Sequence, residues 1–287
     1  MDGQYVHPQN ASLQLYSQSI HYGNGVFEGI RSYKTTEGTK IFKAKEHYER
    51  FKYGAKVMNI PCAYSVQELI DITYELLECN DLEDAYIRPL LTTGSDMSLK
   101  TSSEASLIIQ CWKWGKYMGD NLLKVKTSKF QRPNPRSCFV DAKVTGHYVN
   151  SILAANDAKN DGFDEALLLD MNEQVAESSG ANVFIEINGR LITPAIGHIM
   201  PGITRATIIE ICNREGIPVE ERSISLEEFK TADSAFFTGT AAEVIGLQSI
   251  DDYTFSKAWI DSIGFQLMHL YTSEVLGESK TKLSKAV

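Results

Sequence analysis

The chain carries the segment Asp141-Ala142-Lys143-Val144-Thr145-Gly146-His147-Tyr148-Val149-Asn150, in which a tyrosine follows a lysine by five residues. The apolar spacing that begins here predicts a helix over residues 146–160, so Lys143 stands just before its first turn. A lysine placed there can point into a cleft and lose hydration, which lowers the pKa of its amine. An uncharged amine can attack an aldehyde or remove a proton. The segment therefore indicates a catalytic Lys143 beside Tyr148, against the ordinary alternative of a surface lysine and a core tyrosine.

A carboxylate and two glycine turns follow in order. They are Glu177-Ser178-Ser179-Gly180-Ala181-Asn182, Pro201-Gly202-Ile203-Thr204-Arg205 and Thr238-Gly239-Thr240-Ala241-Ala242-Glu243. Glu177 can keep a pyridine nitrogen protonated, or it can be a solvated strand end. A turn that begins a helix offers free N–H groups to a phosphate, although each turn alone is a weak signal. An amine, a phenol, a carboxylate and two such turns together indicate a site for pyridoxal 5′-phosphate.

Two arginines each allow two interpretations. Arg50 lies on a predicted helix, where it is either a solvated residue or a cation for the phosphate. Arg88 interrupts the apolar run Tyr86-Ile87-Arg88-Pro89-Leu90-Leu91, and a charge inside such a strand needs a partner. A substrate carboxylate would serve, and so would a buried Asp or Glu.

The composition excludes several classes of function. The chain has 287 residues, 43% of them hydrophobic, and a net charge of −9, which argues against nucleic-acid binding. No apolar stretch approaches a membrane span, and the first residues lack the pattern of a signal peptide, so we expect a cytoplasmic protein. The six histidines show no metal-ligand spacing, and we expect no metal.

The pattern predicts an α/β fold of the α+β type with two domains. We expect a small N-terminal domain at residues 1–117, a linker at 118–125 and a large cofactor-binding domain at 126–287. Antiparallel hairpins are frequent, and the strict alternation of a Rossmann sheet is missing. The predicted helix over 146–160 has Val149, Ile152 and Leu153 as its core stripe, and a last helix is predicted over 256–275.

With these residues in view, the chain resembles the branched-chain amino acid aminotransferases of the fold-type IV, class IV aminotransferase family. The resemblance extends from about His21 to Glu243 and rests on His21-Tyr22-Gly23-Asn24-Gly25-Val26-Phe27-Glu28-Gly29-Ile30-Arg31 and Tyr86-Ile87-Arg88-Pro89. It implies a barrel-like β core in the larger domain, and a homodimer or higher homo-oligomer.

The resemblance also implies roles for individual residues. Lys143 would bind the cofactor covalently, Tyr148 would bond its phenolic oxygen and Glu177 its pyridine nitrogen. The phosphate would be held by Arg50, Ile203, Thr204, Gly239 and Thr240. The substrate would meet Tyr22, Phe27, Tyr86, Arg88, Trp114, Tyr117, Thr240, Ala241 and Ala242. Tyr22 and the loop of residues 97–99 would come from the other subunit.

The implied activity is reversible transamination of leucine, isoleucine and valine with 2-oxoglutarate. Two features depart from the family pattern, namely His147 beside the key tyrosine and the acidic loop Ser95-Asp96-Met97-Ser98. Alternatives within the same fold are a D-amino acid or amine aminotransferase and an aminodeoxychorismate lyase. A protein that binds the cofactor without turnover is an alternative of another class.

Overall fold

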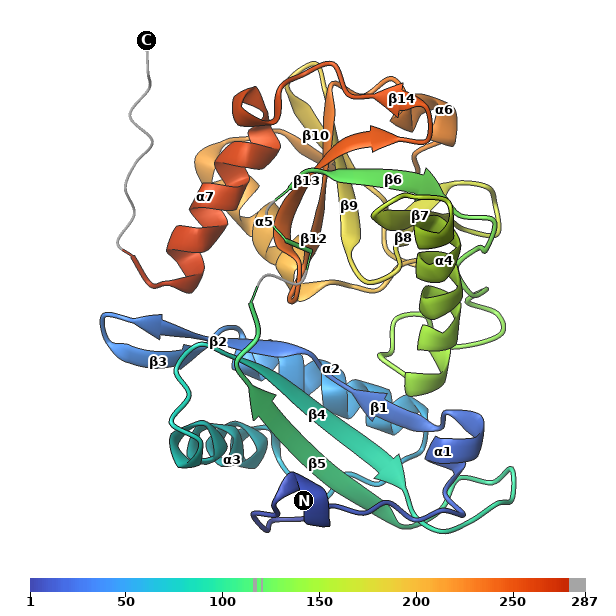
Figure 1. Cartoon of the computed structure of the whole chain (residues 1–287), viewed down its shortest axis with the longest axis vertical. Helices are drawn as coiled ribbons and strands as arrows, with labels where there is room; N and C mark the ends of the chain where they lie inside the picture. The colour runs from blue at the N-terminus through green and yellow to red at the C-terminus, as the bar shows by residue number, and fades with distance from the viewer. Residues whose placement is uncertain (116–117, 120, 279–287) are drawn as a thin grey trace.

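The computed structural model describes residues 1–115, 118–119 and 121–278, and its strands form two separate sheets (Figure 1). In the first sheet β4 is the central strand and pairs with β1, β2 and β5, while β3 extends β2 as a hairpin. Its strands are β1 Gly25–Phe27, β2 Ile30–Thr35, β3 Gly38–Ile41, β4 Ala85–Thr93 and β5 Ala105–Trp112. Every pairing in this sheet is antiparallel.

Two helices pack beside the first sheet (Figure 1). Helix α2 spans Ala44–Val57 and buries Tyr48, Phe51 and Ala55, as its spacing predicts. Helix α3 spans Val66–Cys79 and begins with a capping box, in which Ser65 and Glu68 bond each other's backbone N–H groups. The short helix α1, Gln18–Tyr22, and a 3₁₀ turn at Pro8–Asn10 precede the sheet.

The second sheet closes on itself. Strands β9, β12, β13, β6, β7 and β8 pair in sequence, and β8 pairs back with β9, which makes a six-stranded barrel. Three outlying strands extend this sheet: β10, β11 and β14. The bounds are β6 Leu123–Thr127, β7 Glu165–Leu169, β8 Val175–Ser178, β9 Asn182–Ile187, β10 Arg190–Thr193, β11 Val219–Glu221, β12 Ser234–Gly239, β13 Glu243–Ile250 and β14 Tyr253–Thr254. The barrel-like core and the mixed α/β architecture expected from the sequence are confirmed.

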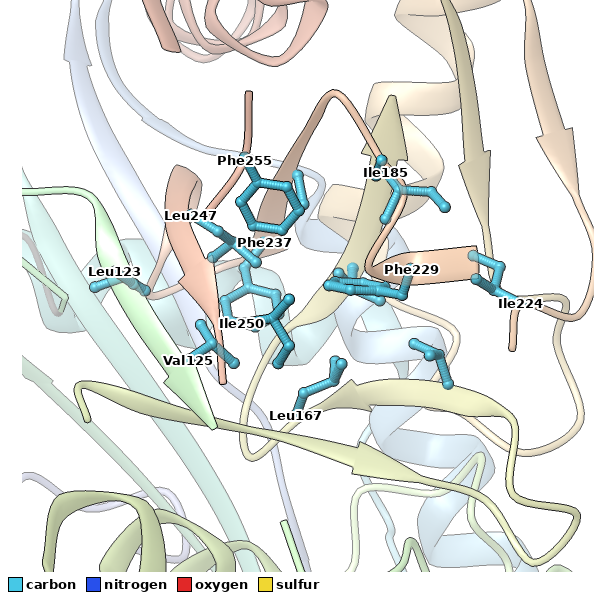
Figure 2. Close-up of a cluster of buried hydrophobic side chains, with 14 of the residues drawn as sticks. Leu123, Val125, Leu167, Ile185, Ile224, Phe229, Phe237, Leu247, Ile250 and Phe255 are labelled. Atoms are coloured by element: carbon cyan, nitrogen blue, oxygen red, sulfur yellow. The ribbon is translucent and has the colours of Figure 1, made fainter. Parts of the chain in front are cut away.

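Apolar side chains fill the interior of the barrel. Figure 2 shows Val125, Leu167, Phe237 and Ile250 directed toward one another from four strands, with Phe229 closing one side. Such a filled interior is typical of small barrels, in which every second residue of a strand points inward. The cofactor-type residues therefore cannot lie inside the barrel, and must lie at its rim or outside it.

The helices of the second part cover the outside of the barrel (Figure 1). Their bounds are α4 Tyr148–Asn160, α5 Ile203–Glu215, α6 Leu226–Phe229 and α7 Ile263–Val275, with 3₁₀ turns at Thr145–His147 and Trp259–Asp261. Helix α7 begins later than the predicted residue 256, because Ser262 caps it and the 3₁₀ turn comes before. Among the described residues, no helix has the length and apolarity needed to cross a membrane.

The predicted core stripe of α4 is wrong. Val149, Ile152 and Leu153 are 58%, 58% and 46% exposed. The helix instead buries Ser151, Ala154 and Ala158. Ala154 and Ala158 pack on Ala166 and Leu168 of β7. Small side chains let the helix approach the strand closely, and the larger apolar residues are left on the outer face.

The linker predicted at residues 118–125 also needs a correction. Strand β6 begins at Leu123 and pairs in parallel with both β13 and β7. Leu123 and Val125 are buried in the barrel core, while Lys124 between them is exposed. The alternating lysines make this strand look like a polar connection in the sequence.

Candidate active site

Lys143 is held by a segment of extended chain that crosses from the barrel to the first sheet. Val144 forms an isolated bridge with Val26 of β1, and Phe27 N–H donates to the carbonyl of Lys143 at 3.0 Å. Ala142 and Val144 are buried in the core of the first sheet. Because side chains alternate along extended chain, the Lys143 side chain points the other way, into the pocket that it lines.

Two glycines allow this crossing. A Cβ built on Gly23 would lie 2.5 Å from Cα of Gly146, which no real Cβ does. Gly23 also has a φ of +68°, where glycine is favoured. Thr145 Oγ1 donates to the carbonyl of Gly23 at 2.6 Å, and Gly146 N–H donates to the same carbonyl at 3.0 Å. Gly23 of the His21–Arg31 motif therefore holds the segment that carries Lys143.

Lys143 and Tyr148 are in direct contact. The Lys143 Nζ donates a 2.6 Å hydrogen bond to the Tyr148 hydroxyl. The ring of Phe27 packs edge-on against the Tyr148 ring with centroids 4.7 Å apart, and Nζ lies 5.1 Å from the Phe27 centroid. The 3₁₀ turn at Thr145–His147 leads into α4 and brings the lysine and the tyrosine together. Both residues were candidates from the sequence, and the structure adds their direct contact.

Glu177 is buried at the end of β8 and is held from three sides. Asn182 Nδ2 donates to its Oε2 at 2.9 Å, Met200 N–H lies 3.2 Å from both oxygens, and Arg132 Nε is 2.8 Å from Oε1. Burial raises the pKa of Glu177, and the charge of Arg132 partly offsets that effect. The carboxyl group is thus well placed to share a proton with a ligand nitrogen.

One pocket collects the predicted cofactor-binding residues. It encloses about 600 Å³, including its open mouth. The residues that line it include the whole predicted set, namely Arg50, Lys143, Tyr148, Glu177, Ile203, Thr204, Gly239 and Thr240. They come from α2, the segment before α4, the first residue of α4, β8, the start of α5, and the end of β12 with the residue after it.

The end of this pocket formed by α5 is suited to an anion. Gly202 is the N-cap of α5 and provides no side-chain cap, so the first N–H groups of the helix lack a capping partner. Thr238 lines the same pocket, and its buried Oγ1 has no hydrogen-bond partner among the described residues. Arg50 supplies a cation there. A phosphate would satisfy these groups together, so the residues present fit pyridoxal phosphate.

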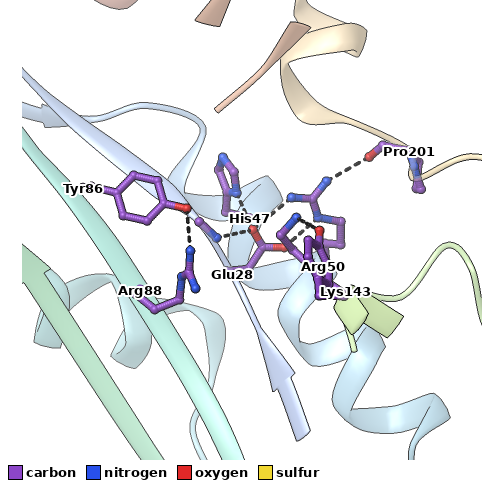
Figure 3. Close-up of polar contacts among 9 residues, drawn as sticks. Glu28, His47, Arg50, Tyr86, Arg88, Lys143 and Pro201 are labelled. Atoms are coloured by element: carbon purple, nitrogen blue, oxygen red, sulfur yellow. Dashed lines mark hydrogen bonds and ion pairs between the residues drawn. The ribbon is translucent and has the colours of Figure 1, made fainter. Parts of the chain in front are cut away.

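Phe27 lies between Lys143 and the predicted substrate residues of the first sheet. Arg88 of β4 lies over the Phe27 ring at 4.8 Å and donates to the Tyr86 hydroxyl at 3.0 Å (Figure 3). Its Nε is buried and has no partner, and no carboxylate among the described residues pairs with it. The alternative of a buried acidic partner for Arg88 thus finds no support in the described chain. The Tyr86 ring packs on Trp114 with centroids 4.5 Å apart.

The turn after β12 reaches the first sheet. Arg31 of β2 donates to the carbonyls of Ala241 at 3.4 Å and Gly115 at 2.9 Å. Ala241 and Ala242 therefore lie where the two sheets meet. Tyr22 does not line the described pocket, and its hydroxyl donates to the carbonyl of Met97 at 3.3 Å. Tyr117, the remaining predicted substrate residue, lies outside the described residues.

Comparison with known proteins agrees with this geometry. A family model described as amino-transferase class IV matches residues 25–250. The chain belongs to the class IV aminotransferase family. It is 38% identical to the branched-chain-amino-acid aminotransferase of Pseudomonas aeruginosa over 285 residues. The match covers 97% of this chain and 93% of the relative.

Solved structures of branched-chain aminotransferases are also similar to this chain. The branched-chain aminotransferase of Thermoproteus uzoniensis with norvaline is 36% identical, with a TM-score of 0.92, over 97% of this chain and 94% of that one. The T.th. branched-chain amino acid aminotransferase complexed with N-(5′-phosphopyridoxyl)-L-glutamate is 34% identical, with a TM-score of 0.92, over 97% of this chain and 93% of that one.

Sequence reasoning missed several residues that support this aminotransferase site. Arg132 and Asn182 hold Glu177. Glu28 and His47 form a buried cluster with Arg50. The sequence signals were an arginine between a strand and a proline-rich turn, and an acid inside the apolar run around Phe27. Neither signal indicates which residue is the partner.

Proposed function

We propose that this chain is a pyridoxal phosphate-dependent branched-chain-amino-acid aminotransferase. It would interconvert leucine, isoleucine or valine and 2-oxoglutarate with the branched 2-oxo acid and glutamate, one substrate after the other in a single site. The observation that carries the proposal is the 2.6 Å contact of Lys143 with Tyr148 in a pocket that also holds Glu177 and the α5 start. Similar proteins named for branched-chain substrates support it.

The bound cofactor would supply an aldehyde for the substrate amine and a ring that accepts electrons. Glu177 would hold a proton at the ring nitrogen, and Arg132 and Asn182 would keep its carboxyl group oriented. Arg50, the N–H groups at the start of α5 and the Gly239–Thr240 turn would bind the phosphate. Each of these roles is a part of the proposal.

Lys143 Nζ would move the proton of the reaction. Once uncharged, it can take a proton from Cα of the amino donor and later return one. The Tyr148 hydroxyl fixes the position of Nζ, and the Phe27 ring shields both groups. This aromatic packing would limit the access of water to Nζ, so the transferred proton would exchange less with solvent.

Substrate recognition would divide between apolar and charged groups. Phe27, Tyr148 and Trp114 would surround a branched side chain, and Tyr117 would join them. The α-carboxylate would meet Thr240, Ala241 and Ala242 near Tyr86. Arg88 would receive the second carboxylate of glutamate, because its buried Nε has no hydrogen-bond partner within the described part of the chain. A similar structure with norvaline and another with a phosphopyridoxyl-glutamate support both kinds of substrate.

We also propose a homodimer. The outer face of α4, formed by Val149, Ile152 and Leu153, is apolar and exposed, and α1 with Tyr22 lies on the same side of the molecule (Figure 1). A second copy would cover this face and bring its own Tyr22 and residues 97–99 to the site. Light scattering after size-exclusion chromatography tests this. Ile152→Glu should yield monomers, whereas a wild-type monomer with full activity would refute the dimer.

The cellular location proposed is the cytoplasm. The cysteines found in the structure are free thiols, which suits a reducing compartment. Fractionation of cells that express the protein, followed by detection with an antibody, tests this directly. Recovery outside the cytoplasmic fraction would contradict the proposal.

A panel of amino donors tests the function. With 2-oxoglutarate as acceptor, L-leucine, L-isoleucine and L-valine should give glutamate, and D-leucine and simple amines should not. Preference for the D-isomers or amines would favour the other aminotransferases of this fold. Release of pyruvate from aminodeoxychorismate would favour the lyase. Binding of the cofactor without any turnover would leave only a carrier role.

A further inference from the structure

A buried carboxylate lies directly behind the proposed phosphate cation. Glu28, in the connection between β1 and β2, is 0% exposed. Its oxygens accept from Arg50 Nε at 2.6 Å, Arg50 Nη2 at 2.9 Å, His47 Nδ1 at 2.8 Å and Gly29 N–H at 3.2 Å (Figure 3). This carboxylate takes no part in the roles assigned above.

The charge state of this cluster follows from its contacts. Burial alone would raise the pKa of Glu28, but Arg50 and His47 together hold it well below the ordinary carboxyl value. Burial lowers the pKa of His47, against the opposing effect of Glu28, and this direction favours the neutral ring. An ionised carboxylate can only accept hydrogen bonds, so His47 Nδ1 carries the hydrogen that it donates. The cluster therefore consists of one anion, one cation and one neutral donor.

Arg50 joins this cluster to the phosphate end of the pocket. Its Nη1 donates to the carbonyl of Pro201 at 2.9 Å, next to the N-cap of α5 (Figure 3). The described residues thus accept from three of the five N–H donors of the guanidinium, which leaves two for a ligand. The Arg50 side chain is only 11% exposed, and a guanidinium buried to that extent is costly without a counter-ion.

We propose that Glu28 is a positioning residue for the phosphate: its two contacts fix the plane and charge of Arg50 so that the free N–H groups face the pocket. The inference rests on the proposed function, because it takes pyridoxal phosphate as the ligand. Because the planar, two-point contact already holds the Arg50 side chain, that side chain loses little further rotamer freedom when a phosphate binds. The contact therefore favours phosphate binding. Glu28→Gln would remove one of the two acceptors and the negative charge.

The test compares two ligands that differ only in the phosphate. Apo-protein is titrated with pyridoxal phosphate and with pyridoxal, and bound ligand is followed by its visible absorption. Both ligands carry the aldehyde that reacts with Lys143, so the ratio of their dissociation constants isolates the phosphate contribution. Glu28→Gln should weaken pyridoxal phosphate binding roughly ten- to a hundred-fold, the effect of one lost charge-assisted bond, and leave pyridoxal within about two-fold.

Glu186→Gln is the matched control. Glu186 is also 0% exposed and accepts from Ser234, Lys257 and Ile263 N–H, away from the pocket. Its variant should keep the wild-type ratio. In an Arg50→Met background, Glu28→Gln should change the ratio no further, because its effect passes through Arg50.

The outcomes separate the two claims. An equal loss for both ligands in Glu28→Gln, or no loss, would overturn the positioning role. A wild-type protein that does not prefer pyridoxal phosphate to pyridoxal would instead overturn the phosphate site of the proposed function. If Glu28→Gln does not fold, Arg50→Lys replaces it, since lysine keeps the charge but cannot make the two-point contact. An unchanged ratio in that variant would overturn the proposal.

Discussion

The amine of Lys143 lies 2.6 Å from the hydroxyl oxygen of Tyr148, to which it donates a hydrogen bond. The two residues belong to different local structures, because Lys143 is in extended chain pinned to β1 and Tyr148 is the first residue of α4. Their contact therefore depends on how the first sheet and the barrel meet. It places an amine and a phenol in the pocket that Glu177 also lines.

Replacing Lys143 by alanine should abolish transamination while some cofactor still binds through its phosphate. The physical reason is that Lys143 is both the covalent attachment point and the proton carrier in the proposed function. Loss of turnover is measured with leucine and 2-oxoglutarate, and binding by equilibrium dialysis. Lys159→Ala, at an exposed position of α4, is the control and should behave as wild type. Near-normal activity of Lys143→Ala with an unchanged visible band would refute the whole account.

Glu177→Gln should leave the fold intact and slow the leucine half-reaction by roughly two to three orders of magnitude, as removal of a preorganised electrostatic group does. A neutral amide cannot hold the ring nitrogen protonated. Stopped-flow absorbance in a single turnover measures the rate, and far-ultraviolet circular dichroism checks the fold. A rate within a factor of about two would show that Glu177 is only a buried strand-end carboxylate.

Gly202→Ala should disturb Glu177 indirectly. A Cβ at Gly202 would lie 1.9 Å from Asn182 Oδ1, so Asn182 must move away from its bond to Glu177. We expect about a tenfold loss in the leucine half-reaction, the cost of about one hydrogen bond. Asn182→Ala should cause a similar loss, and the double variant should add little to either one. Fully additive losses would contradict this route.

Arg88→Leu should impair the glutamate half-reaction more than the leucine half-reaction. Glutamate brings a second carboxylate. The buried Arg88 Nε, which has no hydrogen-bond partner in the residues that the structure describes, can donate to it. A lost charge-assisted hydrogen bond corresponds to about 1.5–3 kcal/mol. Single-turnover kinetics with each donor give the comparison. Equal losses would assign Arg88 to the shared α-carboxylate or to the structure, and a loss confined to leucine would be the opposite of our prediction.

Glu28 should also make the stability of the apo-protein depend on pH. Its pKa is held well below the ordinary carboxyl value of about 4.3, so the unfolded chain takes up this proton first as the pH falls. The stability that Glu28 contributes is therefore full at pH 7 and decreases in acid. By linkage, the difference in the free energy of unfolding between wild type and Glu28→Gln should be about 1 kcal/mol smaller at pH 3.5 than at pH 7. Urea unfolding of both proteins measures it, and a difference independent of pH would be inconsistent with a depressed pKa.

The sequence was informative where local chemistry decides the structure. The dipeptide Asn188-Gly189 is typical of a two-residue hairpin turn. Both residues have positive φ, and they form the hairpin between β9 and β10. The spacing of α2 predicted its buried Tyr48 and Phe51. The order of amine, carboxylate and glycine turns predicted residues that the fold brings into one pocket, because each motif ends or begins a strand or helix at the same rim of the barrel.

Elsewhere the outcome depends on neighbours that are distant in the sequence. The apolar period of α4 is real, but it does not indicate whether Val149 and Ile152 face a core or an exposed surface. The partner of Glu177 is Arg132, forty-five positions earlier, and that of Arg50 is Glu28 on another element. Ion pairs of this kind become visible only when the strands are placed in space.

The most direct test of the central claim is the stoichiometry of a single half-reaction. Holoprotein is mixed with L-leucine in the absence of any 2-oxo acid, and the visible band of the cofactor and the released acid are measured together. We predict that the band is lost as one equivalent of 4-methyl-2-oxopentanoate per bound cofactor appears, and that 2-oxoglutarate then restores it. A band that persists, or one that disappears without release of the 2-oxo acid, would contradict the assignment of this chain as a branched-chain-amino-acid aminotransferase.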